Sequence, residues 1–225
     1  MTFVTDTSPA WHAVAEAAVI GAGTAVLDVG CGTGGFCALA AGRGAVAHGL
    51  DADPLRIERA RLAAPGAELR VGFMEALPWP DDRFDVVCGF NAFQYALDVD
   101  LALAEARRVT RRGGRIAICK WAPPQQNELF ALLGALRGGP APAAEDPLDR
   151  ALTRAGLPTE ATGDVPVAVE LRDDAALAAA LLAAGALEAE PAAADPRLAA
   201  AAAPFRRSDG SYRMACTFHH LSCAV

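Results

Sequence analysis

The stretch that most constrains the fold runs from Val26 to Gly35 and reads Val-Leu-Asp-Val-Gly-Cys-Gly-Thr-Gly-Gly. Its first residues form an apolar run without polar alternation, which is typical of a buried parallel strand. Three glycines follow at alternate positions, and the apolar segment 36–41 then predicts a helix. Glycines let backbone come close to a ligand, and the start of a helix offers that ligand its unpaired N–H groups. The stretch therefore predicts a ligand site in a strand–turn–helix unit.

The next predicted strand supplies an acid for the same site. Residues 45–50 are apolar apart from His48, and Asp51 follows them. Because the carboxyl ends of neighbouring strands in a doubly wound sheet share one crevice, we expect Asp51 to face the glycine turn. A carboxylate in that place can accept hydrogen bonds from both hydroxyls of a ribose. Turn and acid together predict a nucleoside-cofactor site.

Two kinds of cofactor fit this pattern. The spacing Gly30-x-Gly32-x-x-Gly35 satisfies the dinucleotide fingerprint, with Asp51 at about the expected distance of ~20 residues. Asp28 separates the two alternatives, since a carboxylate just before the turn repels a pyrophosphate. The same carboxylate tolerates, or favours, a cofactor that carries a cationic ammonium or sulfonium. Asp28 therefore favours the cationic cofactor.

Several stretches resemble one family in the same order along the chain. Asp28-x-Gly30-x-Gly32-x-Gly34 resembles the first motif of class I S-adenosylmethionine-dependent methyltransferases, in particular the small-molecule enzymes of types 11 and 25. Leu50-Asp51 resembles their ribose-binding strand end, and the stretches 75–87 and 108–114 resemble later motifs. The resemblance spans residues 24–121. It implies S-adenosylmethionine as cofactor, S-adenosylhomocysteine as product, and a set of contact residues comprising Asp28, Gly30, Cys31, Gly32, Gly34, Asp51 and Ala52.

The adenine end of the expected site departs from the family. An aspartate commonly accepts a hydrogen bond from the adenine amino group there, whereas this chain has Phe73. Phe73 either stacks on the ring or lies in the core. We expect the backbone N–H of Met74 to meet the ring, and Glu75 to substitute for the missing acid from a shifted position.

The acceptor is expected at the end of the fourth predicted strand, residues 84–89, which runs into Phe90-Asn91-Ala92-Phe93-Gln94-Tyr95. This strand end neighbours the glycine strand across the switch point of the sheet, so it should lie beside the methyl group to be transferred. We expect Asn91 and Tyr95 to orient the acceptor, and Asn91 also to contact the cofactor. Gln94 is a weaker candidate for a contact with the acceptor.

Other residues of the acceptor side come from distant segments. His12 reaches this place only if the predicted first helix, residues 7–20, folds over the site. It would then be the one side chain there able to act as a modest general base near neutral pH. Residues 121–140 contribute Trp121, Phe130 and several leucines to the same rim. Because this inventory is apolar and aromatic, we expect a small hydrophobic or aromatic acceptor.

Composition limits the partners and the compartment. A net charge of −7 with a pI of about 5.1 argues against nucleic acid and against an anionic membrane surface. The six cysteines show no paired spacing and no signal peptide or spanning helix is evident, which predicts a cytoplasmic protein with reduced thiols. No metal is expected, since His219 and His220 are adjacent on a predicted strand and point to opposite faces. The expected state is a monomer or weak homodimer.

These patterns predict a Rossmann-like, doubly wound α/β fold. Its sheet is seven-stranded and mostly parallel, with an antiparallel last strand and helices on both faces. One domain, residues 1–225, is divided into a cofactor-binding core (21–121), an acceptor-side insert with alanine-rich helices (122–205) and a closing strand (206–225). The expected reaction is direct in-line methyl transfer. The alternatives are a non-methylating reaction such as a cyclisation, or activation of a partner enzyme.

Overall fold

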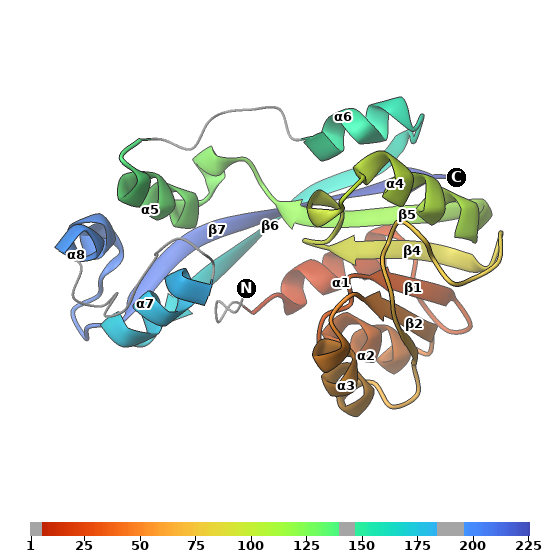
Figure 1. Ribbon diagram of the computed structural model, residues 1–225, viewed down its shortest axis with the longest axis horizontal. Helices are drawn as coiled ribbons and strands as arrows, with labels where there is room; N and C mark the ends of the chain where they lie inside the picture. Colours follow the sequence, from red (N-terminus) through yellow and green to blue (C-terminus); the bar gives the residue numbers. More distant parts are fainter. Residues whose placement is uncertain (1–5, 140–146, 184–195) are drawn as a thin grey trace. The chain divides into compact units, whose positions relative to one another are not determined.

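The computed structural model describes residues 6–139, 147–183 and 196–225, and its strands form one seven-stranded sheet in the order β3-β2-β1-β4-β5-β7-β6 (Figure 1). Strands β1 to β5 pair in parallel. β7 runs antiparallel to β5, since Gly113 donates to the carbonyl of Val225 and Val225 donates to that of Gly114. This confirms the predicted doubly wound sheet. The strands are β1 (Ala25–Val29), β2 (Val46–Asp51), β3 (Glu68–Val71), β4 (Phe84–Phe90), β5 (Thr110–Trp121), β6 (Thr159–Leu171) and β7 (Tyr212–Ala224).

The chain packs as two compact units. The first comprises Ser8–Lys120, Glu145–Gly163 and His219–Val225, and it holds all the residues expected to bind the cofactor. The second comprises the remaining segments, Met1–Thr7, Trp121–Ala144 and Asp164–Phe218.

In the first unit, helices cover both faces of the sheet, as predicted. α2 and α3 pack on one face, whereas α4 and α6 pack on the other (Figure 1). Asp53 begins α3 by accepting from the Leu55 N–H at 2.8 Å, and Asp98 caps α4 in the same way. These caps fix where the chain leaves the carboxyl ends of the strands. The helices are α1 (Ser8–Ala17), α2 (Gly35–Gly42), α3 (Pro54–Ala63), α4 (Val99–Val109) and α6 (Pro147–Arg154).

The second unit has its own core around α5 (Glu128–Arg137), α7 (Asp174–Ala183) and α8 (Pro196–Ala202). The buried amide of Asn127 fixes the start of α5. Its Nδ2 donates to the carbonyl of Ala122 at 2.7 Å, and its Oδ1 accepts from the N–H of Thr217 at 2.9 Å. Of the predicted alanine-rich helices, α7 and α8 are present, and residues 184–195 lie outside the described residues.

Strand β5 is longer than the sequence predicts. The two glycines in the stretch 110–115 favour a turn before the apolar residues 116–119, but β5 already begins at Thr110. The reason is the pairing of Gly113 and Gly114 with Val225, which draws this stretch into the ladder. The partner is over a hundred residues away, so local sequence signals favour the turn.

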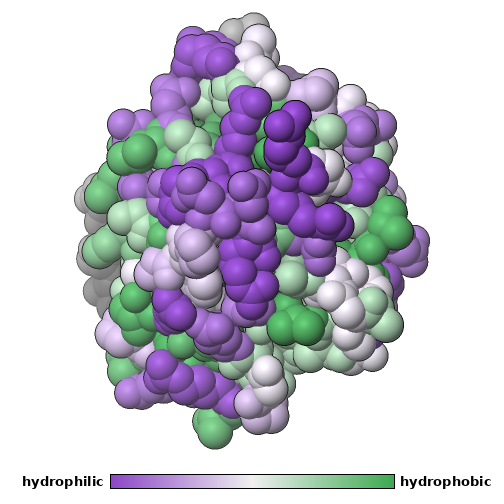
Figure 2. All heavy atoms as spheres, turned by 90° about the vertical axis from the view of Figure 1, so that its right-hand side faces the viewer, coloured by the Kyte–Doolittle hydropathy of each residue, from purple (hydrophilic) through white to green (hydrophobic). Residues whose placement is uncertain are grey.

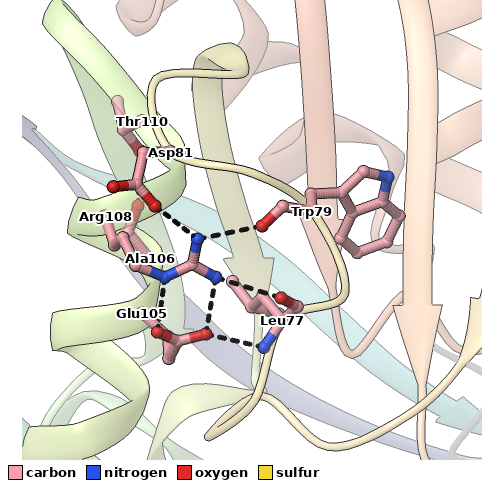
Figure 3. Close-up of polar contacts among 7 residues, drawn as sticks. All are labelled: Leu77, Trp79, Asp81, Glu105, Ala106, Arg108 and Thr110. Carbon is pink, nitrogen blue, oxygen red and sulfur yellow. Dashed lines mark hydrogen bonds and ion pairs between the residues drawn. The ribbon is translucent and has the colours of Figure 1, made fainter.

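Arg108 clamps the connection between β3 and β4 onto α4 (Figure 3). Its guanidinium donates to the carbonyls of Leu77 and Trp79, to Asp81, and twice to Glu105, at 2.7 to 3.0 Å. Glu105 also accepts from the N–H of Leu77 at 2.8 Å. These acidic partners raise the pKa of Arg108. The clamp thus fixes a segment that follows shortly after Phe73–Glu75.

The face of the first unit on the right of Figure 1 suits contact with water. Figure 2 shows that hydrophilic side chains predominate on it, with hydrophobic ones scattered among them. Arg111 and Arg112 at the start of β5 are exposed, and Arg111 pairs with Asp85. Among the described residues, no helix has the length and apolar character needed to cross a membrane.

Arg108→Lys should destabilise the protein, because an ammonium cannot make the forked contacts of a guanidinium. Losing two or more hydrogen bonds to charged or carbonyl partners should lower the free energy of unfolding by about 2 kcal/mol or more. At this chain length the melting temperature should fall by roughly 4–8 °C. Arg112→Lys makes the same change at an exposed position and should leave the melting temperature within about 1 °C. Equal melting temperatures for the two variants would refute the clamp.

Candidate functional site

The glycine turn is built by close backbone contacts at the ends of β1 and β2. The N–H groups of Gly30 and Cys31 both donate to the carbonyl of Leu50, at 2.7 and 3.0 Å. A Cβ at Gly30 would lie 2.7 Å from the Cβ of Ala92, and one at Gly34 would lie 2.9 Å from the Cα of Ala60. Glycine is therefore required at both positions by space alone, and the turn is held against its neighbours on two sides.

Gly32 differs from these two glycines. Its φ of +54° is left-handed, yet a Cβ built there would meet no atom within 4 Å. Its N–H donates to Oδ2 of Asp51 at 2.8 Å, and Oδ1 of Asp51 accepts from the N–H of Asp53 at 3.0 Å. Asp51 thus faces the glycine turn, as the sequence predicts. Turn and acid meet under open space, beside exposed Ala52.

Asp28 lies beneath this turn and is 3 % exposed. Its nearest polar side-chain partners are thiols, with Sγ of Cys37 at 3.9 Å from Oδ2 and Sγ of Cys88 at 4.0 Å from Oδ1. Burial raises the pKa of Asp28 well above its ordinary range and the Asp51 carboxylate adds to this, whereas the Cys37 thiol opposes it. In the described part of the chain no arginine or lysine pairs with Asp28. The Asp28 carboxyl is therefore shielded from solvent and surrounded by weak hydrogen-bonding partners.

The segment after β3 places three expected adenine-side residues in different surroundings. Gly72 donates to the carbonyl of Asp51 at 3.0 Å, which sets the following residues close to Asp51. Phe73 is 61 % exposed, which excludes the core alternative and leaves its ring available for stacking. Met74 packs partly against the core. Glu75 accepts from the N–H of Leu97 at 2.7 Å, so its carboxylate holds the loop before α4.

The end of β4 leads to Ala92, which lies against the glycine turn, with Asn91 just before it and Tyr95 three residues after it. Asn91 has a left-handed φ of +49°, and its N–H donates to the carbonyl of Cys119 at 2.7 Å. The next residue, Ala92, is the one that closes on Gly30. Tyr95 ends a 3-10 turn, Phe93–Tyr95, and is 66 % exposed. That Asn91 and Tyr95 orient an acceptor stays a prediction.

Helix α1 brings Trp11 and not His12 to the glycine turn. A Cβ at Gly35 would lie 2.3 Å from Cη2 of Trp11, so the indole covers the start of α2. His12 is exposed, and its Nδ1 lies 3.0 Å from Nη2 of Arg43, the residue that ends α2. A guanidinium can only donate, so this nitrogen accepts. The structure does not bring His12 together with Asn91 and Tyr95.

The cysteines are all free and buried. Cys37 and Cys88 flank the Asp28 carboxyl, and burial raises the pKa of the Cys88 thiol. Thiols with a raised pKa are weak nucleophiles, so we assign them a packing role. Across residues 6–139, 147–183 and 196–225, no group of three histidine, cysteine or acidic side chains is arranged to hold a metal ion.

The segment that carries the glycine turn is similar to known methyltransferase sequences. Residues 27–118 match the family model described as "Methyltransferase domain". Methyltransferase GfsG from Streptomyces halstedii is 40% identical over 106 residues, which cover 44% of this chain and 38% of that protein. The chain spans less than half the length of the curated relatives that it matches first.

Solved structures share the fold over nearly the whole chain. A putative methyltransferase from Bacillus halodurans C-125 superposes with a TM-score of 0.66 at 17% identity, covering 95% of this chain and 97% of that one. The [4+2]-cyclase SpnF superposes with a TM-score of 0.59 at 20% identity, covering 93% and 79%. The chain therefore has the class I methyltransferase fold, and its matching segment carries the glycine turn and Asp51.

Asp28→Asn should stabilise the free protein, increasingly as the pH rises. The unfolded chain loses the Asp28 proton near pH 4, whereas the folded chain keeps it to a higher pH. The free energy of unfolding of the natural chain therefore falls as pH rises above about 4, until the folded carboxyl ionises. Asparagine has no such proton. The melting temperature of Asp28→Asn should exceed that of the natural chain by more at pH 8 than at pH 5.

The control for this measurement is Glu58→Gln, which makes the same carboxyl-to-amide change at an exposed position of α3. It should run parallel to the natural chain across this pH range. A constant difference between Asp28→Asn and the natural chain would show that Asp28 has an ordinary pKa when folded.

Proposed function

We propose that this chain, with its class I methyltransferase fold, binds S-adenosylmethionine and transfers the methyl group to a small hydrophobic or aromatic metabolite. The observation that carries the proposal is the meeting of the Gly32 N–H and the Asp51 carboxylate beneath open space. A cationic cofactor would favour the ionised form of the buried Asp28 carboxyl below it, whereas a pyrophosphate would be repelled by that form.

Each end of the cofactor has a proposed partner in the first unit. Both oxygens of Asp51 already accept one N–H, and each retains a second lone pair for a ribose hydroxyl. Phe73 follows Gly72 just after the end of β3, and its exposed ring stacks on adenine. The Met74 N–H donates to a ring nitrogen of adenine, a role separate from that of the missing acid, which accepts from the amino group.

The chain's contribution to the reaction is alignment in a shielded site. When bound, S-adenosylmethionine supplies an activated methyl group, which the acceptor takes in one in-line displacement that leaves S-adenosylhomocysteine. Asn91 and Tyr95, at the end of β4, orient the acceptor. We assign no general base, since the one titrating candidate of the sequence, His12, is held by Arg43.

The second unit has a mostly apolar groove of its own. A groove of about 500 Å³ lies along α5 there. The neighbouring ring of Trp121 stacks on Phe218 with centroids 4.2 Å apart. The Asn127 contacts hold the start of α5 in place, so the groove has one rigid wall. A net charge of −7 further favours a small molecule over nucleic acid. The groove is lined by Pro124, Gln125, Phe130, Ala131, Gly134, Ala135 and Gly139.

The second candidate is a non-methylating reaction on the same cofactor-binding fold. The likeness to a [4+2]-cyclase favours it, because a shared fold does not fix the reaction. Both candidates require the cofactor site, so only product analysis separates them.

Incubation with S-adenosylmethionine labelled in its methyl group and an extract of small metabolites should yield a labelled product. Label should appear in an organic-soluble compound, because the acceptor is hydrophobic. In parallel, S-adenosylhomocysteine at about 100 times its Kd should stabilise the protein by about 2.7 kcal/mol, whereas NAD should not. Stabilisation without any labelled product favours the non-methylating candidate. Stabilisation by NAD alone would refute the choice of cofactor.

Asp51→Ala should weaken S-adenosylhomocysteine at least tenfold in calorimetry. A hydrogen bond to a charged acceptor contributes about 1.5–3 kcal/mol, and the carboxylate is proposed to serve two hydroxyls. About 1.4 kcal/mol already corresponds to tenfold. Asp51→Asn keeps an oxygen for one hydroxyl and should show a smaller loss. Unchanged affinity in a folded Asp51→Ala protein would refute the ribose assignment.

A further inference from the structure

Two aromatic rings meet at the carboxyl end of β4, beside the glycine turn. Phe90 is the last residue of β4, and Trp11 of α1 lies edge-to-face against it, with ring centroids 6.5 Å apart and an angle of 78° between the planes. Phe36, at the start of α2, packs on Phe90 with ring centroids 4.4 Å apart. Phe36 is 2 % exposed, whereas Trp11 and Phe90 are both partly exposed. The Trp11–Phe90 pair therefore rests on a buried ring and keeps a surface of its own.

Gly35 leaves the room that the indole occupies. A Cβ built at Gly35 would clash with Cη2 of Trp11 and would lie only 3.0 Å from Cζ3 and 3.1 Å from Cζ2. Gly35 is the last glycine of the spacing that also satisfies the dinucleotide fingerprint. In this chain the absence of its side chain is explained by the placement of Trp11 at the turn.

The pair lies on the same face of the sheet as the Asp28 carboxyl. Sγ of Cys88 is 4.0 Å from Oδ1 of Asp28. Because side chains alternate along a strand, Phe90 points to the same face as Cys88, and its contact with Phe36 of α2 agrees with this. A carboxyl and the π faces of aromatic rings both interact favourably with a cation.

Neither ring of the pair is covered by a cationic side chain. Elsewhere in the first unit Arg70 lies over the ring of Trp79, with its Cζ 4.8 Å from the centroid. Within residues 6–139, 147–183 and 196–225, no arginine or lysine takes such a place over Trp11 or Phe90. The chain therefore leaves these two rings available to a cation from outside.

The order of the strands leads from the ribose acid to these rings. Along the carboxyl edge of the sheet the order is β3, β2, β1, β4. In the proposed function adenine stacks on Phe73 just after β3, and the ribose binds Asp51 at the end of β2. The cofactor's sulfur is attached to the other end of the ribose from adenine. The same line therefore carries the sulfur over the turn after β1 toward the end of β4, where Trp11 and Phe90 meet.

We propose that Trp11 and Phe90 bind the positively charged sulfonium of S-adenosylmethionine by cation–π contact, and so distinguish the cofactor from its uncharged product. The inference rests on the proposed function. Transfer of the methyl group leaves a neutral sulfur in S-adenosylhomocysteine, which gains no such contact. The pair thus favours binding of the cofactor over retention of the product.

The test compares ligands that differ in charge at this one place. S-adenosylmethionine carries a sulfonium there and sinefungin an ammonium, whereas S-adenosylhomocysteine carries a neutral sulfur. All three share the adenosine and amino-acid ends. In calorimetry, Trp11→Leu and Phe90→Leu should each weaken both cationic ligands about fivefold more than S-adenosylhomocysteine. Trp11→Phe keeps an aromatic ring and should show a smaller difference.

Phe205→Leu is the matched control at a partly buried position of the second unit, and it should bind all three ligands as the natural chain does. Melting temperatures show which variants fold, and either folded leucine variant of the pair is sufficient for the test. Weakening of all three ligands by one factor would overturn the inference, since lost packing affects charged and uncharged ligands alike. Unchanged affinity for the cationic ligands would overturn it too. If the natural chain binds none of the three, the proposed function itself fails, which is a distinct result.

Discussion

The hydrogen bond from the Gly32 N–H to the Asp51 carboxylate joins the two halves of the cofactor site. Gly32 belongs to the turn after β1 and Asp51 ends β2, so the bond can form only when these strands pair in register. Its neighbours depend on the same register, since Leu50 accepts from both Gly30 and Cys31. The sheet thus fixes the site by backbone contacts, and side chains add charge and recognition.

Much of this architecture could be predicted from the sequence because it is recorded in local patterns. The apolar run before Gly30 marks β1, and the acid after the next apolar run marks the end of β2. Their meeting follows from the rule that parallel strands share one crevice at their carboxyl ends. The helix starts at Asp53 and Asp98 are equally local, since a capping side chain acts within three residues.

Features made by distant partners could not be predicted in this way. The pairing of Gly113 with Val225 turns an expected loop into strand, and no local signal announces it. The orientation of a side chain is equally invisible. Trp11 and His12 are adjacent in sequence, yet only Trp11 covers the glycine turn, while His12 pairs with Arg43. Glu75 shows the same limit, because its carboxylate holds the N–H of Leu97.

The close contacts at Gly30 and Gly34 have a consequence for how this sequence can change over evolution. Each glycine is matched by one small residue elsewhere in the chain, Ala92 against Gly30 and Ala60 against Gly34. A larger side chain at either alanine would clash with the turn, as would any side chain added at the matching glycine. The ligand-binding motif is therefore partly discontinuous, and two alanines on a helix and a loop share its selective constraint. A search with the contiguous glycine pattern alone would overlook them.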